Sequence, residues 1–174
     1  SEIQKLKPDI LGIGIYIWNR SQSLGLIERL QKQMPELKIV AGGPEVSFEK
    51  EGSLAYPIIS GEGEKKWVEF LDLTRKNEAP SDDVLKRWRT YGTDLPELIP
   101  PYLKEDFSKL KNRIVYFETS RGCPYLCSFC LSALDKTVRY FDETTIQKQI
   151  KELIPAGIEK IKFVDRTFNL KPSR

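Results

Sequence analysis

The three cysteines of this 174-residue chain, Cys123, Cys127 and Cys130, lie within eight residues and have the spacing C-x3-C-x2-C. Thiolates bind iron strongly, so three of them on one tight loop can hold three corners of a cubic 4Fe–4S cluster. The fourth iron would then stay open for a substrate or a cofactor. Arg121 and Gly122 precede the first cysteine, where a cation favours the thiolate form and glycine permits an unusual turn.

Other interpretations of these cysteines are three thiols without metal, a zinc site and an electron-transfer cluster. Structural zinc sites use four protein ligands, and the chain has neither a histidine nor a fourth cysteine. An electron-transfer cluster normally has four cysteines as well. The odd number of cysteines argues against a disulfide framework, and a reducing cytoplasm is the simplest compartment.

The first part of the chain has the pattern of an open parallel α/β sheet. Residues 9–17 form an apolar, β-rich run that predicts a strand buried on both faces. Two further strands are expected at 37–41 and 57–60, and a helix capped by Ser21 follows the first strand. The second strand runs into Gly42-Gly43, which marks a sharp strand exit.

The cysteine loop itself is expected between the elements of a βαβ unit. Residues 114–119 predict a strand directly before the loop, and residues 161–165 predict the next one. Asp142 is a typical N-cap for the connecting helix, and Gly157 a typical stop.

Ligands of parallel sheets bind at the carboxyl ends of the strands, so Asp165 and Asn169 should share an edge with the cysteines. Both residues suit ligand binding, and both are also common turn-capping residues.

The composition between the two parts indicates a linker, because residues 77–112 combine a polar stretch with several prolines. We therefore expect domains at 1–76 and 113–174, with a short helix near 84–88 inside the linker. The net charge of +3 is spread along the chain, so nothing indicates nucleic-acid binding. No apolar run reaches the length of a membrane span, and the first residues lack the apolar core of a signal peptide. A cytoplasmic protein with small-molecule partners is the expectation.

The segment from Glu118 to Ser132, Glu-Thr-Ser-Arg-Gly-Cys-Pro-Tyr-Leu-Cys-Ser-Phe-Cys-Leu-Ser, resembles the cluster loop of the radical S-adenosylmethionine superfamily. The resemblance implies that the three cysteines bind a 4Fe–4S cluster and that S-adenosylmethionine chelates the open iron. It also implies that Phe129 packs near the adenine and that the strand end at Asp165 and Asn169 touches the amino group of the cofactor. The implied reaction is the reductive cleavage of S-adenosylmethionine to a 5′-deoxyadenosyl radical. The implied fold of this part is a partial TIM barrel.

The first part is similar to the later strands of Rossmann-like cobalamin-binding domains, on the residues Val40-Ala-Gly-Gly-Pro-Glu45 and Ser60-Gly-Glu-Gly-Glu64. In such a domain Gly42 and Gly43 would let the backbone approach a flat ligand closely. The family's cobalamin-ligand motif, Asp-x-His-x-x-Gly, would lie before residue 1, and Gly14 stands where the family has a serine. A domain that serves substrate binding or structure is therefore the alternative to cobalamin binding.

The chain is expected to be an internal fragment, because the radical fold needs six βα units and the cysteine half holds about one and a half. Cut sheets expose strand edges, which predicts self-association. The leading hypothesis is a radical S-adenosylmethionine enzyme whose substrate the sequence does not indicate. The alternative is a non-catalytic α/β module that binds cobalamin or a nucleotide.

Overall fold

The computed structural model describes residues 2–50, 52–90, 102, 107–135, 137–168 and 170. The chain divides into two compact units, Ser1–Thr93 and Asp94–Arg174. Most of the proline-rich segment of the expected linker, as well as Asn169, lies outside the described residues.

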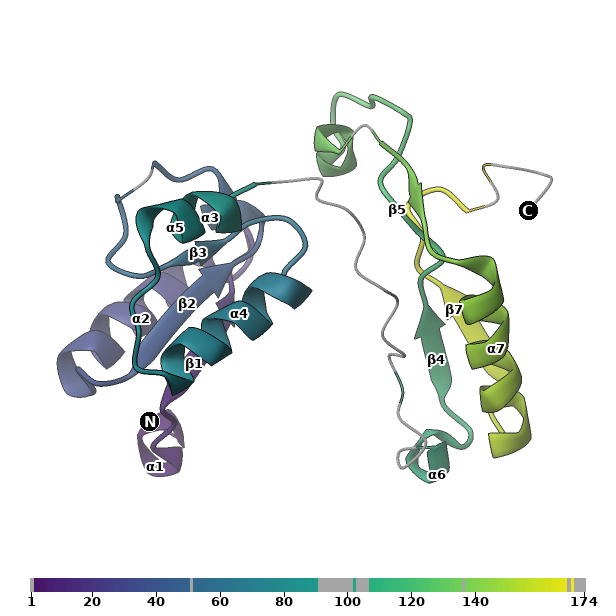
Figure 1. Ribbon diagram of the computed structural model, residues 1–174, viewed down its shortest axis with the longest axis horizontal. Coiled ribbons are helices and arrows are strands. Elements are labelled where there is room, and N and C mark those ends of the chain that lie inside the picture. The colour runs from purple at the N-terminus through teal and green to yellow at the C-terminus, as the bar shows by residue number, and fades with distance from the viewer. Residues whose placement is uncertain are drawn as a thin grey trace. The chain divides into compact units, whose positions relative to one another are not determined.

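The first unit is built on a parallel sheet of three strands in the order β1-β2-β3 (Figure 1). These strands are β1 (Ile10–Gly14), β2 (Lys38–Gly42) and β3 (Ile58–Ile59). Gly14 lies opposite Gly42 in the register, and Gly42 lies opposite Ile59. The prediction of a parallel α/β sheet is confirmed for this unit, although β1 ends at Gly14 rather than at residue 17.

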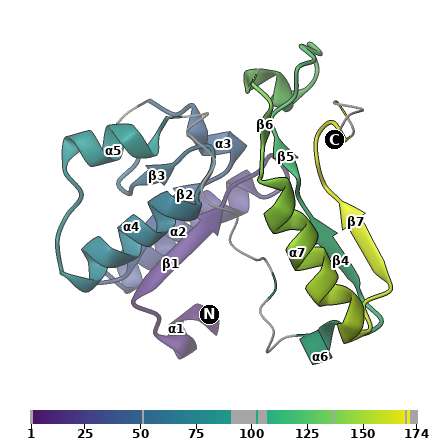
Figure 2. The same cartoon turned by 45° about the vertical axis from the view of Figure 1, so that its right-hand side comes forward.

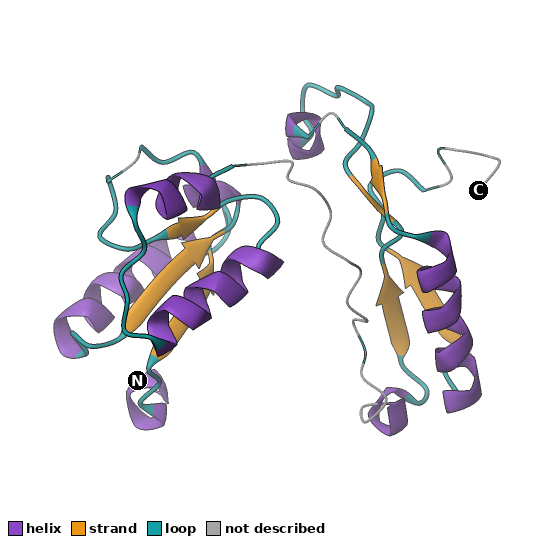
Figure 3. Cartoon of the chain, in the orientation of Figure 1, coloured by secondary structure: helices purple, strands orange, loops and turns teal. Residues whose placement is uncertain are grey.

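Helices cover both faces of this sheet, which gives the unit three layers (Figure 3). On one face, Ile27 and Leu30 of α2 (Arg20–Gln33) pack with Ile39 of β2. On the other face, Phe70 of α4 (Glu64–Arg75) packs with Val40, the next residue of β2. The alternation of strand side chains thus supplies two separate cores.

The short helices of the first unit are α1 (Glu2–Leu6), α3 (Pro44–Ser47) and α5 (Asp82–Trp88). The prediction that Ser21 caps α2 is wrong, because the helix begins at Arg20 and its N-cap position is Asn19.

The helix α5 belongs to the first unit, although its sequence was placed in a linker. Its Trp88 is fully buried and shares a core with Val40, Ile59 and Phe70. The indole Nε1 of Trp88 donates to Glu69 Oε2 at 2.6 Å, and the carbonyl of Trp88 accepts from the Ser60 amide at 2.9 Å. Val84 and Leu85 of α5 pack against the same core, so the short helix expected near 84–88 is present but is part of this unit.

The second unit contains a βαβ arrangement of β4 (Ile114–Phe117), α7 (Glu143–Leu153) and β7 (Lys160–Phe163). The two strands are parallel, and α7 lies along them (Figure 2). As predicted, Asp142 caps α7 by accepting the Thr145 amide at 2.8 Å, and Gly157 follows in the left-handed conformation. A short 3-10 helix, Ile154–Ala156, separates α7 from Gly157.

The remaining elements of the second unit are small. They are α6 (Phe107–Leu110), a 3-10 helix at Leu131–Leu134, and the antiparallel strands β5 (Ser120–Arg121) and β6 (Arg139–Tyr140). Among all described helices α2 is the longest, with 14 residues, and none of them is long and apolar enough to cross a membrane.

The β4–β7 sheet has two different edges. Within the described residues β7 pairs only with β4. On β4, the hydroxyl of Tyr102 accepts the amide of Tyr116 at 2.7 Å and donates to the carbonyl of Tyr116 at 3.2 Å. A side chain thus occupies main-chain groups that another strand would need. Because two strands alone make no barrel, the partial barrel remains a prediction.

Candidate functional site

The cysteines lie in the loop that joins β5 to β6, close after the end of β4. All three thiols are free. Cys123 is buried, whereas Cys127 and Cys130 are exposed. The first cysteine is therefore built into the unit, and the other two lie on its surface.

The base of this loop is a tight crossing of two chain segments. Arg121 pairs with Arg139 across β5 and β6, and the Cys123 amide donates to the Asp135 carbonyl at 3.3 Å. Gly122 has a φ of +91°, and a Cβ at this position would lie 1.8 Å from the carbonyl oxygen of Thr137. Only glycine fits here, for a packing reason that involves no metal.

The end of β7 is attached to the start of the loop through Asp165. Its Oδ1 accepts three hydrogen bonds: from the Thr119 amide at 3.0 Å, the Thr119 hydroxyl at 2.8 Å and the Ser120 hydroxyl at 2.7 Å. Its Oδ2 is buried without a hydrogen-bond partner among the described residues. Two residues further on, Thr167 Oγ1 lies 3.1 Å from Cys123 Sγ. Asp165 thus lies at the edge where the sequence placed it, and one of its oxygens is an unused acceptor.

The chemistry of the donor set suits an iron–sulfur cluster, but its arrangement is not that of a closed metal site. Among the described residues, no group of three or more histidine, cysteine, aspartate or glutamate side chains is arranged to hold a metal ion. Three thiols on one loop nevertheless match the ligand type and number of a cluster with one open iron. A change in the exposed part of the loop would have to bring Cys127 and Cys130 to Cys123.

Charges and hydrogen bonds favour the thiolate at one of the exposed cysteines. The pKa of Cys130 is lowered, first by hydrogen bonds from the backbone and side chain of Ser132 and further by the positive charge of Arg166. Arg121, which the sequence suggested for this role, instead donates from Nε to Glu118 Oε2 at 2.8 Å. Its guanidinium also lies over the ring of Phe141, 5.4 Å from the centroid.

Exposed apolar side chains surround the outer cysteines. The ring of Phe129 is 92% exposed, so it contributes little to packing within the loop. Tyr125, Leu126 and Leu131 are also exposed, and Phe168 stacks on Phe163 with centroids 5.0 Å apart. An aromatic ring this accessible is free to stack on a flat ligand.

In the first unit, Gly42 ends β2 and Gly43 follows with a φ of +99°. A Cβ on Gly43 would lie 2.4 Å from the carbonyl oxygen of Ile15. The Ile15 amide also donates to the Gly42 carbonyl at 2.8 Å. Gly43 therefore permits a close backbone contact with Ile15, directly after β1, and the contact of Gly42 and Gly43 with a flat ligand remains a prediction.

An apolar loop beside this contact was missed at the level of sequence. The strand predicted at 9–17 includes Tyr16 and Ile17, but β1 ends at Gly14, and Ile17 and Trp18 are 77% and 73% exposed. The rings of Tyr16 and Trp18 stack with centroids 4.8 Å apart and an interplanar angle of 4°. The Asn19 side chain fixes the turn, since Oδ1 accepts the Tyr16 amide at 2.7 Å and Nδ2 donates to the Gly14 carbonyl at 3.0 Å. The apolar run at 9–17 is longer than the five-residue strand β1, and this excess length could have indicated the exposed apolar loop.

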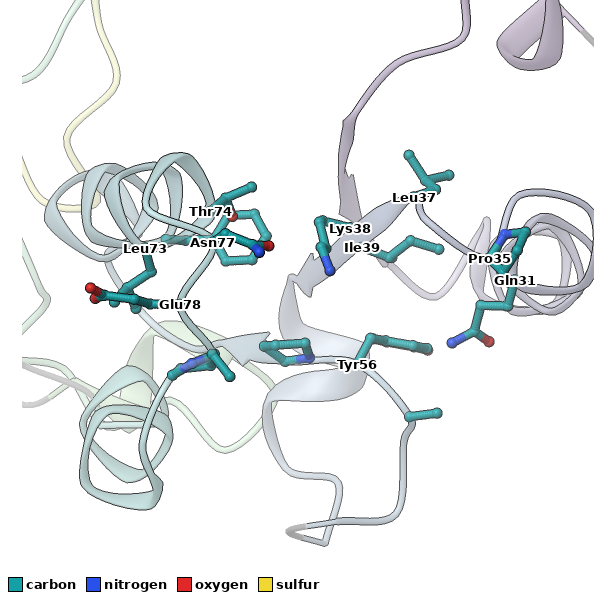
Figure 4. A pocket seen from close by; sticks show the side chains of 15 residues that line it. Gln31, Pro35, Leu37, Lys38, Ile39, Tyr56, Leu73, Thr74, Asn77 and Glu78 are labelled. Carbon is teal, nitrogen blue, oxygen red and sulfur yellow. The ribbon is translucent and has the colours of Figure 1, made fainter.

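A cavity of about 510 Å³ lies at the opposite, amino-terminal edge of the first sheet (Figure 4). Leu37 and Lys38 at the start of β2 line it, together with Tyr56, Asn77 and Glu78. None of the residues predicted from the sequence to form a site is among its lining residues.

Comparisons with known proteins relate part of the first unit to a family and nearly the whole chain to several methyltransferases. Residues 1–71 match the B12 binding domain family. The chain is 29% identical over 195 residues to the cobalamin-dependent radical SAM methyltransferase TokK of Streptomyces tokunonensis. It is 26% identical over 193 residues to 2-(S-pantetheinyl)-carbapenam-3-carboxylate methyltransferase of Streptantibioticus cattleyicolor. The chain is thus a homologue of methyltransferases of the cobalamin-dependent radical SAM type.

These alignments cover 96% and 95% of the chain but only 28% of each relative. Among solved structures, the radical S-adenosylmethionine methyltransferase TsrM of Kitasatospora setae matches with a TM-score of 0.57 and 15% identity. That match covers 94% of the chain and 38% of TsrM, and it shows a shared fold. The chain therefore corresponds to well under half the length of these proteins.

Proposed function

We propose that the chain forms the cobalamin-binding domain and the cluster-binding loop of a radical S-adenosylmethionine enzyme. The observation that carries the proposal is the position of the cysteine loop, which leaves the carboxyl end of a parallel βαβ unit beside Asp165. A match to the B12 binding domain precedes this loop in the same chain. When bound, the cluster would supply the electron that cleaves S-adenosylmethionine to a 5′-deoxyadenosyl radical.

In this proposal Cys123, Cys127 and Cys130 are the cluster ligands. Phe129 offers its exposed ring to the adenine, and the unused Oδ2 of Asp165 is an acceptor for the ammonium group of S-adenosylmethionine. Asn169 would serve the same ligand. Methyl transfer is the reaction class that the names of the relatives favour.

The cobalamin side of the proposal rests on the carboxyl edge of the first sheet. Gly42 and Gly43 place backbone without a Cβ at this edge, and the exposed Tyr16–Trp18 stack provides an apolar surface beside the Gly43–Ile15 contact. Because the chain has no histidine, it offers no imidazole ligand to the cobalt. The described residues of this edge would contribute shape and apolar contact to cobalamin binding.

The first experiment is anaerobic reconstitution of the full chain with iron and sulfide. The wild-type chain should bind about four irons per molecule, as expected of a three-thiolate 4Fe–4S site, and a triple Cys→Ala variant should bind none. Far-ultraviolet circular dichroism controls for the fold of the variant, because the second unit contains none of the three tryptophans. Equal iron in both proteins would contradict the assignment of the cysteines.

The second experiment titrates the chain with hydroxocobalamin. Trp18→Ala should weaken binding, because it removes half of the exposed aromatic stack. Leu6→Ala is the matched control, since Leu6 is 79% exposed on α1 and lies outside the proposed site. Equal affinities of the wild type, Trp18→Ala and Leu6→Ala for hydroxocobalamin would show that the apolar loop does not contact cobalamin.

The alternative is a non-catalytic module that binds cobalamin or a nucleotide through the first unit. The absence of a closed metal arrangement among the described residues favours this alternative. Cobalamin binding without iron uptake after reconstitution would decide for it.

A further inference from the structure

Cys123 has a side-chain partner from a distant part of the chain, the segment that follows β7. Its sulfur lies 3.1 Å from the hydroxyl oxygen of Thr167, which is 44 positions further along the chain. Cys123 is 9% exposed, whereas Cys127 and Cys130 are both exposed. Only the first of the proposed ligands is thus already fixed by tertiary structure.

The position of Thr167 is itself set by the contacts of the β7 end. The Val164 amide donates to the Phe117 carbonyl at 2.9 Å, which extends the β4–β7 pairing beyond the strand. Next to it, Asp165 accepts three hydrogen bonds from Thr119 and Ser120. The segment carrying Thr167 is therefore attached to the start of the cysteine loop, three residues before Cys123.

We propose that Thr167 is a positioning residue whose hydroxyl donates a hydrogen bond to the ligating sulfur of Cys123. A thiolate has no proton to give, so the hydroxyl must be the donor once the sulfur is a ligand. The bond would orient the first ligand before the exposed part of the loop closes on the metal. This inference rests on the proposed function, because it concerns the ligand sphere of the same cluster.

The hydrogen bond has a consequence for redox chemistry. Hydrogen bonds to the sulfurs are among the factors that set the reduction potential of an iron–sulfur cluster. The reduced cluster carries one more negative charge than the oxidised cluster, so a donor stabilises it more and raises the potential. Loss of the Thr167 hydroxyl should therefore make the cluster harder to reduce.

The variants are Thr167→Val, which keeps the shape and removes the hydroxyl, and Thr167→Ser, which keeps the hydroxyl. Thr74→Val, on α4 of the first unit, is the matched control. Each full-length chain is reconstituted anaerobically, assayed for iron and sulfide, and titrated redox-potentiometrically with detection by electron paramagnetic resonance.

Thr167→Val should bind iron but show a reduction equilibrium about tenfold less favourable, which is about 59 mV for a one-electron couple. Thr167→Ser and Thr74→Val should match the wild type. Loss of iron from Thr167→Val but not from Thr167→Ser would also support the positioning role.

An unchanged potential in a fully loaded Thr167→Val variant would overturn the inference and leave the proposed function standing. The same change in Thr167→Ser as in Thr167→Val would also overturn it, since the hydroxyl would then not matter. A wild-type chain that binds no iron would refute the proposed function and this inference together.

Discussion

Replacing Gly43 by alanine tests the backbone contact that joins the ends of β1 and β2. Gly43 has a φ of +99°, and a new Cβ would lie 2.4 Å from the Ile15 carbonyl oxygen and 2.9 Å from the Ile15 nitrogen. Both atoms belong to the backbone, so no side chain can rotate away. The variant must move the end of β1 or the start of α3.

Two costs add up in this variant. Gly43 combines its positive φ with a ψ of 163°, a backbone region almost restricted to glycine, which costs an L-residue about 1–3 kcal/mol. Forcing one extra carbon into a packed site costs about 1–3 kcal/mol. The free energy of unfolding of the first unit should therefore fall by roughly 2–6 kcal/mol. Two other glycines separate these costs. Gly52 has a φ of +75° with nothing within 4 Å of its Cβ position, and Gly25 lies in α2 with equally open space.

Gly52→Ala should thus lose only about 1–2 kcal/mol, and Gly25→Ala should gain about 1 kcal/mol because alanine favours the helix. All three tryptophans of the chain, Trp18, Trp67 and Trp88, lie in the first unit. Denaturant titration followed by tryptophan fluorescence therefore reports on this unit. Equal losses for the Gly43 and Gly52 variants would refute the steric argument.

Three further predictions concern single contacts. Asp142→Ala removes the acceptor of the Thr145 amide and should cost about 1 kcal/mol, measured as faster hydrogen exchange throughout α7; unchanged exchange would contradict the cap. Lys66 donates to the Ser60 and Thr90 carbonyls at 2.6 and 2.8 Å, so Lys66→Met should destabilise the first unit by about 1–3 kcal/mol. Burial lowers the pKa of Lys66 from its ordinary value of 10.5. Between the lowered pKa and 10.5 the unfolded chain binds more protons than the folded chain, so the stability difference between wild type and variant should grow as the pH rises toward 10.5. A difference that does not change with pH would refute this argument. Tyr102→Phe leaves the main-chain groups of Tyr116 at the edge of β4 without the hydroxyl and should increase self-association, measured by sedimentation velocity. A variant that sediments like the wild type would show that the hydroxyl does not protect this edge.

Local patterns predicted those parts of the fold that neighbouring residues determine. The apolar runs ahead of Gly42 and of the cysteine loop marked β2 and β4, because both strands are buried on at least one face. Asp142 and Gly157 marked the beginning and the end of the connecting helical segment through backbone chemistry that acts within a few residues.

Contacts between distant residues could not be predicted in this way. The burial of Trp88 depends on Phe70 and Val40, which come from other elements. The contact between Thr167 and Cys123 depends on the pairing of two strands that α7 separates. The spacing of the cysteines predicted the candidate ligands of the site. It did not indicate that Cys123 is buried whereas Cys127 and Cys130 are exposed.

The close contact of Gly122 with Thr137 affects how the glycine before the first cysteine should be interpreted in related sequences. The Cβ position of Gly122 is filled by the Thr137 carbonyl oxygen, which no substitution elsewhere can remove. Any lineage that keeps this loop must keep glycine at 122, even one that has lost the metal. Retention of a ring at Phe129, which is 92% exposed and adds little to loop packing, would instead reflect selection for a ligand. Across homologues, the aromatic position is therefore the more informative marker of retained cofactor chemistry.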